Sequence, residues 1–85
     1  MTVKIQVIEN DTNIPIGHAL VELIGKEKDI TKSGYTNNSG WIEFSNIEDG
    51  KYIVKIRHAD YRPFTRTRYL SRNSMLEIKL DKGYP

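Results

Sequence analysis

Few side chains in this sequence could carry out catalysis. The chain has two histidines, His18 and His58, and no cysteine. The lack of cysteine excludes disulfides, thiolate zinc sites and a cysteine nucleophile. A catalytic or metal-bound histidine needs converging carboxylates, and Asp60 is the acid nearest to His58 in the sequence. The serines lack the G-x-S-x-G context of an activated nucleophile. We therefore predict a protein that is not an enzyme and uses no cofactor.

Acidic residues gather in predicted loops, where they could bind calcium if they met at one end of the fold. They are Asp11, Glu27, Asp29, Glu48 and Asp49. Their spacing does not follow the D-x-D-x-D pattern of a calcium loop. We therefore predict no metal site.

Basic residues concentrate in the second part of the chain. Residues 1–50 carry four basic and eight acidic side chains, a net charge of −4, and residues 51–85 carry nine and three, a net charge of +6. If their strands are neighbours, a basic stripe suited to phosphate or acidic polysaccharide would form from Lys55, Arg57, Arg66 and Arg68, with Arg62 and Arg72 beside it. Alternatively, charges on an edge strand prevent unwanted pairing between sheets. We expect no nucleic-acid partner.

Hydrophobic alternation predicts strands in nearly the whole chain and no substantial helix. The expected strands cover Thr2–Ile8, His18–Ile24, Ile30–Thr36, Trp41–Ser45, Lys51–His58, Phe64–Leu70 and Met75–Leu80. Asn37–Gly40 is the strongest turn signal, and Gly34 weakens its strand or marks a bulge. Short strands at this spacing predict one domain over residues 1–85, a seven-stranded antiparallel Greek-key β-sandwich.

The inward positions of these strands predict the hydrophobic core. We expect it to contain Val3, Ile5, Val7, Ala19, Val21, Leu23, Ile42, Phe44, Tyr52, Val54, Ile56, Leu76 and Ile78.

Two segments resemble the carboxypeptidase regulatory-like domains, which have a transthyretin-like (prealbumin-like) sandwich. Thr12–Leu23 is similar to the pattern T-x-x-P-I-x-x-A-x-V-x-L, and Gly34–Phe44 followed by Ile47, Gly50 and Tyr52 is similar to T-x-x-x-G-x-F-x-F-x-x-L-x-x-G-x-Y. The resemblance spans residues 3–80. It implies a noncatalytic module of a larger assembly or multidomain surface protein, whose partner is another protein chain or domain.

Two related groups carry chemistry that the resemblance lets us compare with this chain. The transthyretin-related hydroxyisourate hydrolases end in Tyr-Arg-Gly-Ser, whereas this chain ends in Asp81–Pro85. Collagen-adhesin B-type domains join a lysine of the first strand to an asparagine late in the domain by an isopeptide bond, which forms beside a glutamate in the strand after the G-x-Y turn. Lys4 could supply the amine, but residues 51–58 contain no glutamate. Neither comparison favours a reactive site.

Alternation places two large apolar residues, Trp41 and Ile53, outside the core. If their strands lie in one sheet, they form a contact face with Glu43, Lys55 and Arg57, and this is the predicted protein-binding surface. The alternative function is a carbohydrate- or polyanion-binding domain that uses Trp41 and the basic strand face.

No apolar run approaches the ~20 residues of a membrane-spanning helix. Met1–Val7 alternates polar and apolar residues, so it is not the apolar region of a signal peptide. We therefore expect no membrane insertion, and the sequence leaves the compartment open, with the family resemblance leaning towards one outside the cytoplasm.

Overall fold

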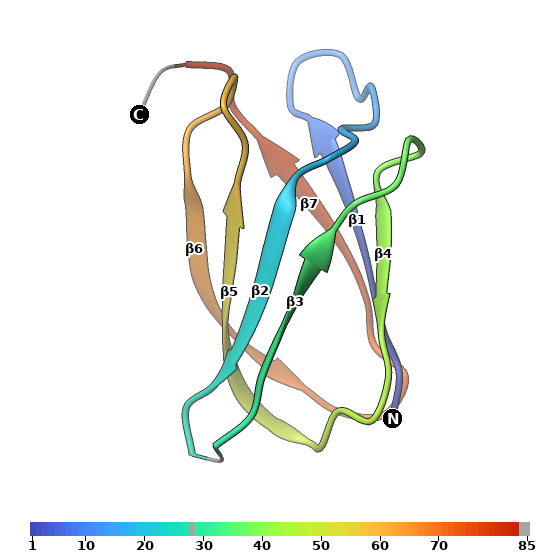
Figure 1. The fold of residues 1–85 in the computed structure, drawn as a ribbon, viewed down its shortest axis with the longest axis vertical. Coiled ribbons are helices and arrows are strands. Elements are labelled where there is room, and N and C mark those ends of the chain that lie inside the picture. Colours follow the sequence, from blue (N-terminus) through green and yellow to red (C-terminus); the bar gives the residue numbers. More distant parts are fainter. Residues whose placement is uncertain (28, 84–85) are drawn as a thin grey trace.

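A computed structural model, which describes residues 1–27 and 29–83, contains two β-sheets packed face to face (Figure 1). The small sheet has the strand order β4-β1-β7, and the large sheet has the order β3-β2-β5-β6. The strands are β1 (Val3–Glu9), β2 (Leu20–Gly25), β3 (Thr31–Tyr35), β4 (Trp41–Phe44), β5 (Gly50–Arg57), β6 (Phe64–Leu70) and β7 (Met75–Leu80). The predicted all-β, seven-stranded sandwich is confirmed.

The described part of the chain contains no helix long and apolar enough to cross a membrane. Neighbouring strands pair antiparallel except β1 and β7, which run parallel with Ile5 opposite Leu76. This parallel pair arises because the connection after β6 crosses from the large sheet to the small one, so that β7 enters in the direction of β1 (Figure 1).

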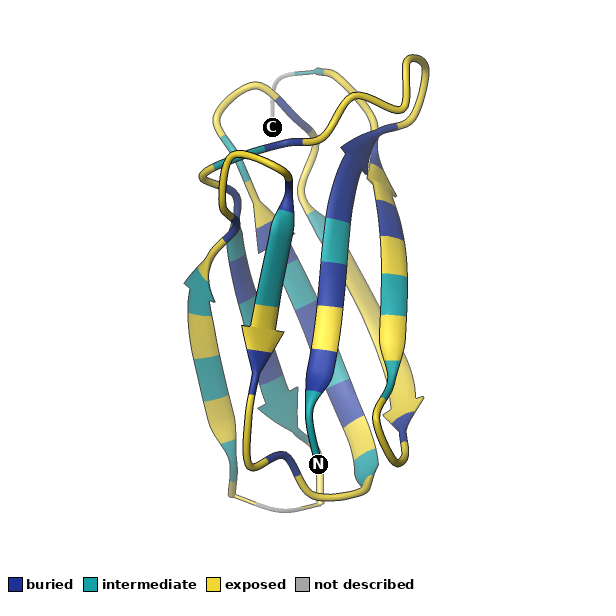
Figure 2. Ribbon diagram, turned by 90° about the vertical axis from the view of Figure 1, so that its right-hand side faces the viewer, coloured by how far each residue is buried: buried dark blue, intermediate teal, exposed yellow. Residues whose placement is uncertain are grey.

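The core lies between the sheets, as the alternation predicts. Figure 2 shows the alternation as buried and exposed bands along β1, where Val3, Ile5 and Val7 are buried and Lys4 is exposed. Of the predicted core residues, only Ile42 and Leu76 are half-buried, and both pack against the core. Strand ends and connections add further buried apolar residues: Ile8, Ile16, Ile47, Tyr61, Leu70 and Leu80.

The turn at Asn37–Gly40 is held by one side chain and one glycine. The Oδ1 atom of Asn37 accepts hydrogen bonds from the N–H groups of Ser39, at 2.9 Å, and Trp41, at 3.0 Å. Gly40 has a φ of 78°, and a Cβ there would lie 2.5 Å from the carbonyl oxygen of Val7. The turn therefore requires glycine both for its backbone angle and for its close approach to β1.

Gly34 has a different role from the predicted bulge. It lies opposite Val21 in a continuous β2–β3 register, so the strand is not bulged. A Cβ at this position would lie 2.8 Å from Cδ1 of Ile42 in the other sheet. Glycine therefore allows β3 and β4 to stack closely.

Candidate interaction surfaces

The predicted contact face is divided between the two sheets. Trp41 and Glu43 belong to β4 in the small sheet, whereas Ile53, Lys55 and Arg57 belong to β5 in the large sheet. The outward sides of the two sheets point in opposite directions, so these five residues do not form one face. The prediction required β4 and β5 to share a sheet, and that condition is not met, because the chain changes sheets between them.

The outer face of the large sheet carries apolar side chains from all four strands. Tyr35 and Tyr69 are each 65% exposed, and the other three are half-buried. Leu20 pairs with Tyr35 in one row, and Ile24 pairs with Ile53 in another. We call this set the large-sheet patch: Leu20, Ile24, Tyr35, Ile53 and Tyr69.

Charged residues lie between and beside the rows of the large-sheet patch. Glu22 is paired in register with Lys55, and its Oε1 atom lies 3.4 Å from a guanidinium nitrogen of Arg57. Lys51 lies next to Tyr69 on the neighbouring strand. An apolar surface interrupted and bordered by charges has the composition of a protein contact surface.

The predicted basic stripe does not form, although its two strands are neighbours. Val54 pairs with Arg66, and Tyr52 pairs with Arg68. Directly paired residues point to the same side of a sheet, so both arginines project from the inner face. Lys55 and Arg57 project from the outer face, and Arg62 and Arg72 lie in the connections at the two ends of β6. Alternation within a strand shows which residues share a face, but only the register between β5 and β6 shows which faces lie on the same side of the sheet.

Trp41 lies on the outer face of the small sheet and is half-buried. It pairs with Gln6, and it borders a shallow depression together with Met75, which is 68% exposed. Lys4, the amine considered for an isopeptide bond, pairs with Glu43 and Met75 on the same outer face. Its exposed position separates it from the core.

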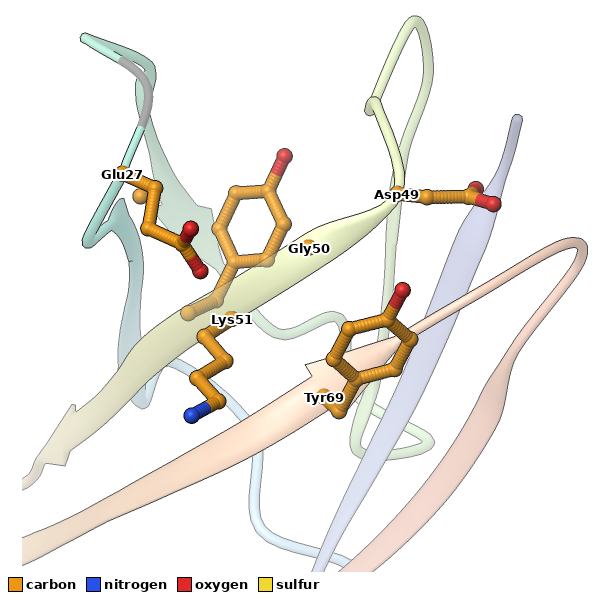
Figure 3. Close-up of a pocket in the computed structure, with 7 residues that line it drawn as sticks. Glu27, Asp49, Gly50, Lys51 and Tyr69 are labelled. Atoms are coloured by element: carbon orange, nitrogen blue, oxygen red, sulfur yellow. The ribbon is translucent and has the colours of Figure 1, made fainter.

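A second depression lies at the end of the large sheet where β5 begins (Figure 3). Glu27, Lys51 and Tyr69 line it, but the side chain of Asp49 points away from Glu27. The described residues contain no group of three or more His, Asp or Glu side chains that could hold a metal ion. The loop carboxylates are therefore not gathered into a cation site in this part of the chain.

Both histidines border one open groove at the opposite end of the large sheet, together with Tyr35 and Arg57. His18 is exposed and His58 is half-buried. The Nδ1 atom of His58 accepts a hydrogen bond from the backbone N–H of Asp60 at 3.1 Å, and its ring meets the ring of Tyr61 edge-on at 5.2 Å. No carboxylate lines this groove among the described residues, so the histidines lack an orienting acid.

A polar cluster missed by the sequence reasoning joins β1 to both ends of the β6–β7 segment. The hydroxyl of Tyr61 donates a 2.6 Å hydrogen bond to Oε2 of Glu9, and Lys82 Nζ lies 3.8 Å from the same oxygen. The bond from Tyr61 is the main cause that lowers the pKa of Glu9, and it raises the pKa of Tyr61 to about 12. Glu9 and Tyr61 are buried, so the cluster fastens the connections at this end of the sandwich.

The large-sheet patch was also missed in part, although a signal for it exists. Alternation puts Leu20 and Ile24 on the side of β2 opposite the core, as it does Ile53 on β5. What a single strand cannot show is that these side chains become neighbours across β3, β2, β5 and β6. That grouping depends on sheet order.

The sequence matches no protein-family model, and a search of curated proteins finds no relative. Solved structures match the fold. A group B streptococcus pilus 2b backbone protein has a TM-score of 0.77 and 14% identity, with 96% of this chain and 41% of that chain covered. This chain therefore spans less than half of that pilus protein.

Two further structures extend the comparison. Klebsiella pneumoniae 5-hydroxyisourate hydrolase has a TM-score of 0.76 and 17% identity, with 98% of this chain and 92% of the hydrolase covered. A type II cohesin–X-dockerin complex from Acetivibrio cellulolyticus has a TM-score of 0.61 and 28% identity, with all of this chain and 55% of the other covered. The chain thus has the transthyretin-like (prealbumin-like) β-sandwich fold that the sequence resemblance implied.

Proposed function

We propose that the chain is a noncatalytic protein-interaction module of a larger assembly, and that it contacts another protein chain or domain through the large-sheet patch. The observation that supports this proposal is the row-by-row exposure of Leu20, Ile24, Tyr35, Ile53 and Tyr69 on one sheet face. Solvated strand faces usually display polar residues, whereas apolar side chains gathered on one face and rimmed by charges mark contact sites.

The chemistry of the patch fits a protein partner. Tyrosines contribute large contact areas with little loss of conformational freedom, and they are enriched at the centres of protein interfaces. Glu22, Lys55 and Arg57 place both signs of charge inside the same face. Such mixed charge favours a partner with a complementary pattern over a uniformly anionic polymer.

The noncatalytic part of the proposal is supported by the surroundings of the two histidines, the side chains best suited to catalysis. The groove beside His18 and His58 has no lining carboxylate among the described residues. The fold alone does not decide the question, because it occurs in a pilus backbone protein and in a hydrolase. The pilus protein is at least a precedent for this fold within an assembly subunit.

Site-specific photo-crosslinking in the cells that produce the protein tests the proposal. A photoreactive phenylalanine analogue replaces Ile53 in the patch or Ile14 in the β1–β2 connection, where the side chain is 60% exposed. We expect a discrete protein adduct from position 53 and none from position 14, because only the first lies in the proposed interface.

A second variant links the adduct to the patch. Tyr35→Ser removes an aromatic ring from the same face and should reduce the yield from position 53, whereas Met75→Ser removes an equally exposed side chain from the small sheet and should not. Equal adducts from positions 53 and 14, or no adduct at position 53, would contradict the proposed interface.

A further inference from the structure

The two sheets differ in width, and the difference lies at one side of the sandwich. On the opposite side β3 stacks closely on β4, because Gly34 approaches Ile42. The large sheet has four strands and the small sheet has three, so, counted from that side, β6 has no strand of the small sheet opposite it. Phe64 and Leu70 at the ends of β6 still pack on the core, and the overhang is confined to the middle of the strand, where Arg66 and Arg68 are exposed.

Within the described chain, β7 pairs with β1 as its only neighbouring strand. Its other edge is unpaired from Met75 to Lys79, and it is closed just beyond Leu80, where the N–H of Arg62 donates to the carbonyl of Asp81 at 2.9 Å.

The unpaired edge of β7 presents backbone groups at alternate residues. The N–H of Lys4 donates to the carbonyl of Ser74 at 3.0 Å, and the N–H of Asn10 donates to the carbonyl of Leu80 at 2.9 Å. Alternate residues of a strand turn their backbone groups to the same side, so the even-numbered residues from 74 to 80 face β1. The backbone N–H and C=O groups of Met75, Glu77 and Lys79 therefore face the free edge, where another strand can pair.

The overhanging strand β6 supplies cations above this edge. Arg66 and Arg68 project from the inner face of the large sheet, yet both are exposed because the small sheet ends before it reaches them. The Arg66 guanidinium lies 5.9 Å from the ring centroid of Phe64. Neither arginine has an ion pair or a side-chain hydrogen bond with another described residue.

We propose that the free edge of β7 binds an extended segment of another protein as an added strand, and that this segment carries acidic residues at alternate positions. A strand paired with β7 would lie beneath β6, and every second side chain would point at its inner face. Alternate residues of a strand are ~6.6–6.8 Å apart, which is also the spacing between the positions of Arg66 and Arg68. Carboxylates at such positions would pair with the two guanidinium groups.

A second copy of this chain fits the site less well than an acidic segment. Its own β7 would bring either Leu76, Ile78 and Leu80 or Met75, Glu77 and Lys79 toward the arginines. Neither set provides carboxylates at successive alternate positions. Charge complementarity therefore favours a partner with a different sequence.

Two labelled peptides of identical composition test the proposal by fluorescence anisotropy. One alternates four threonines with four glutamates, and the other has the four glutamates in one block. At low salt, where exposed charges are weakly screened, we expect the alternating peptide to bind about tenfold more tightly. The net charges are equal, so the difference reports strand geometry.

Two pairs of variants locate the bound peptide. Glu77→Pro removes a backbone donor from the free edge without removing one that faces β1, and Glu77→Ala is its control. Both changes remove a negative charge, which alone would strengthen binding of an acidic peptide. We expect Glu77→Pro to abolish the preference for the alternating peptide and Glu77→Ala to keep it.

The double variant Arg66→Ala/Arg68→Ala should weaken binding about tenfold, whereas Lys55→Ala/Arg57→Ala, with the same loss of charge on the outer face, should weaken it much less. Equal effects of the two double variants, or equal binding of the two peptides, would show that only non-specific electrostatic attraction holds the peptide, and this would overturn the proposal. So would a heparin fragment that binds more tightly than the peptide and is indifferent to Glu77→Pro.

Analytical ultracentrifugation tests whether a second copy of this chain, rather than an acidic segment, binds the free edge of β7. A concentration-dependent dimer that Glu77→Pro abolishes would assign the edge to a second copy and overturn the acidic partner. If Glu77→Pro does not fold, as judged by circular dichroism, the two double variants and the two peptides decide the result. The result for the free edge of β7 does not depend on the proposed interface at the large-sheet patch, because that patch lies on the outer face of the other sheet.

Discussion

Strands β5 and β6 are paired neighbours in one sheet, yet the middle parts of their inner faces have opposite character, although Phe64 and Leu70 at the ends of β6 pack on the core. Tyr52, Val54 and Ile56 of β5 are buried, whereas Arg68 and Arg66, which pair with the first two of these, are exposed. The compared residues are direct partners in the β5–β6 register, and they point to the same side of the sheet. We attribute the difference to the opposite sheet, which has one strand fewer and so leaves the middle of β6 uncovered. Alternation assigns a side chain to a face, but the facing layer decides whether that face is core.

The pair Tyr52 and Arg68 provides the strongest test of this comparison. Tyr52 is 1% exposed and its hydroxyl donates to the carbonyl of Glu48 at 2.6 Å. We expect Tyr52→Ala to lower the free energy of unfolding by about 3–5 kcal/mol, because it leaves a large cavity. Arg68→Ala should change it by less than ~0.5 kcal/mol. Urea denaturation of both variants measures the contrast, and similar losses would show that the small sheet covers β6 after all.

The closed side of the sandwich, where β3 meets β4, should be sensitive to added volume. Gly34→Val places a branched side chain against Ile42, and we expect it to lower the free energy of unfolding by about 1–3 kcal/mol. Because the two side chains compete for the same space, the double variant Gly34→Val/Ile42→Ala should lose less than the sum of the single variants. Strictly additive losses in thermal or urea denaturation would mean that the strands are not in close contact.

Tyr61, in the connection from β5 to β6, should make stability depend on pH in both directions. The pKa of Glu9 lies below its ordinary value of 4.5, so the stability it contributes is present above that value and is lost as the pH falls through the lowered pKa. The pKa of Tyr61 is raised to about 12, so its contribution is present below pH 10 and is lost as the pH rises through about 12.

Tyr61→Phe removes the shared hydrogen bond and should lower the melting temperature at pH 7 by several degrees, with a smaller loss in acid, where Glu9 is protonated. Absorbance at 295 nm provides a direct check. The difference between the titration curves of the original protein and the variant should show one tyrosine ionising near pH 12. A midpoint near pH 10 would contradict the hydrogen bond to Glu9.

The elements of this fold were predictable because local patterns specify them. All seven strands begin and end within two residues of the predicted bounds, and Asn37–Gly40 forms the expected turn. The parallel pairing of β1 with β7 was not predictable, because no local pattern records which sheet a strand joins. Ile47 and Leu70 are buried at places where a connection or a strand end folds over the core, which depends on the whole chain.

The candidate surfaces were harder to predict for the same reason. Trp41 and Ile53 were correctly placed outside the main core, but sheet order separates them onto opposite sides of the molecule. Arg66 and Lys55 lie on neighbouring strands, which was the condition for the basic stripe, but the register puts them on opposite faces. A contact surface joins residues from several strands, so it requires the order and register that alternation alone lacks.

The outer faces of β2 and β5 have no sheet above them, so interactions there should be weak in the isolated chain. Glu22 and Arg57 lie 3.4 Å apart, and their side chains are 26% and 64% exposed. A double-mutant cycle with Glu22→Gln and Arg57→Gln should give a coupling free energy of about 0.2–1 kcal/mol. Added salt should reduce it, because exposed charges are screened. Urea denaturation of the four proteins measures the value. A coupling several times larger that salt does not reduce would show that water is excluded from this face, and β5 would then be covered on both sides.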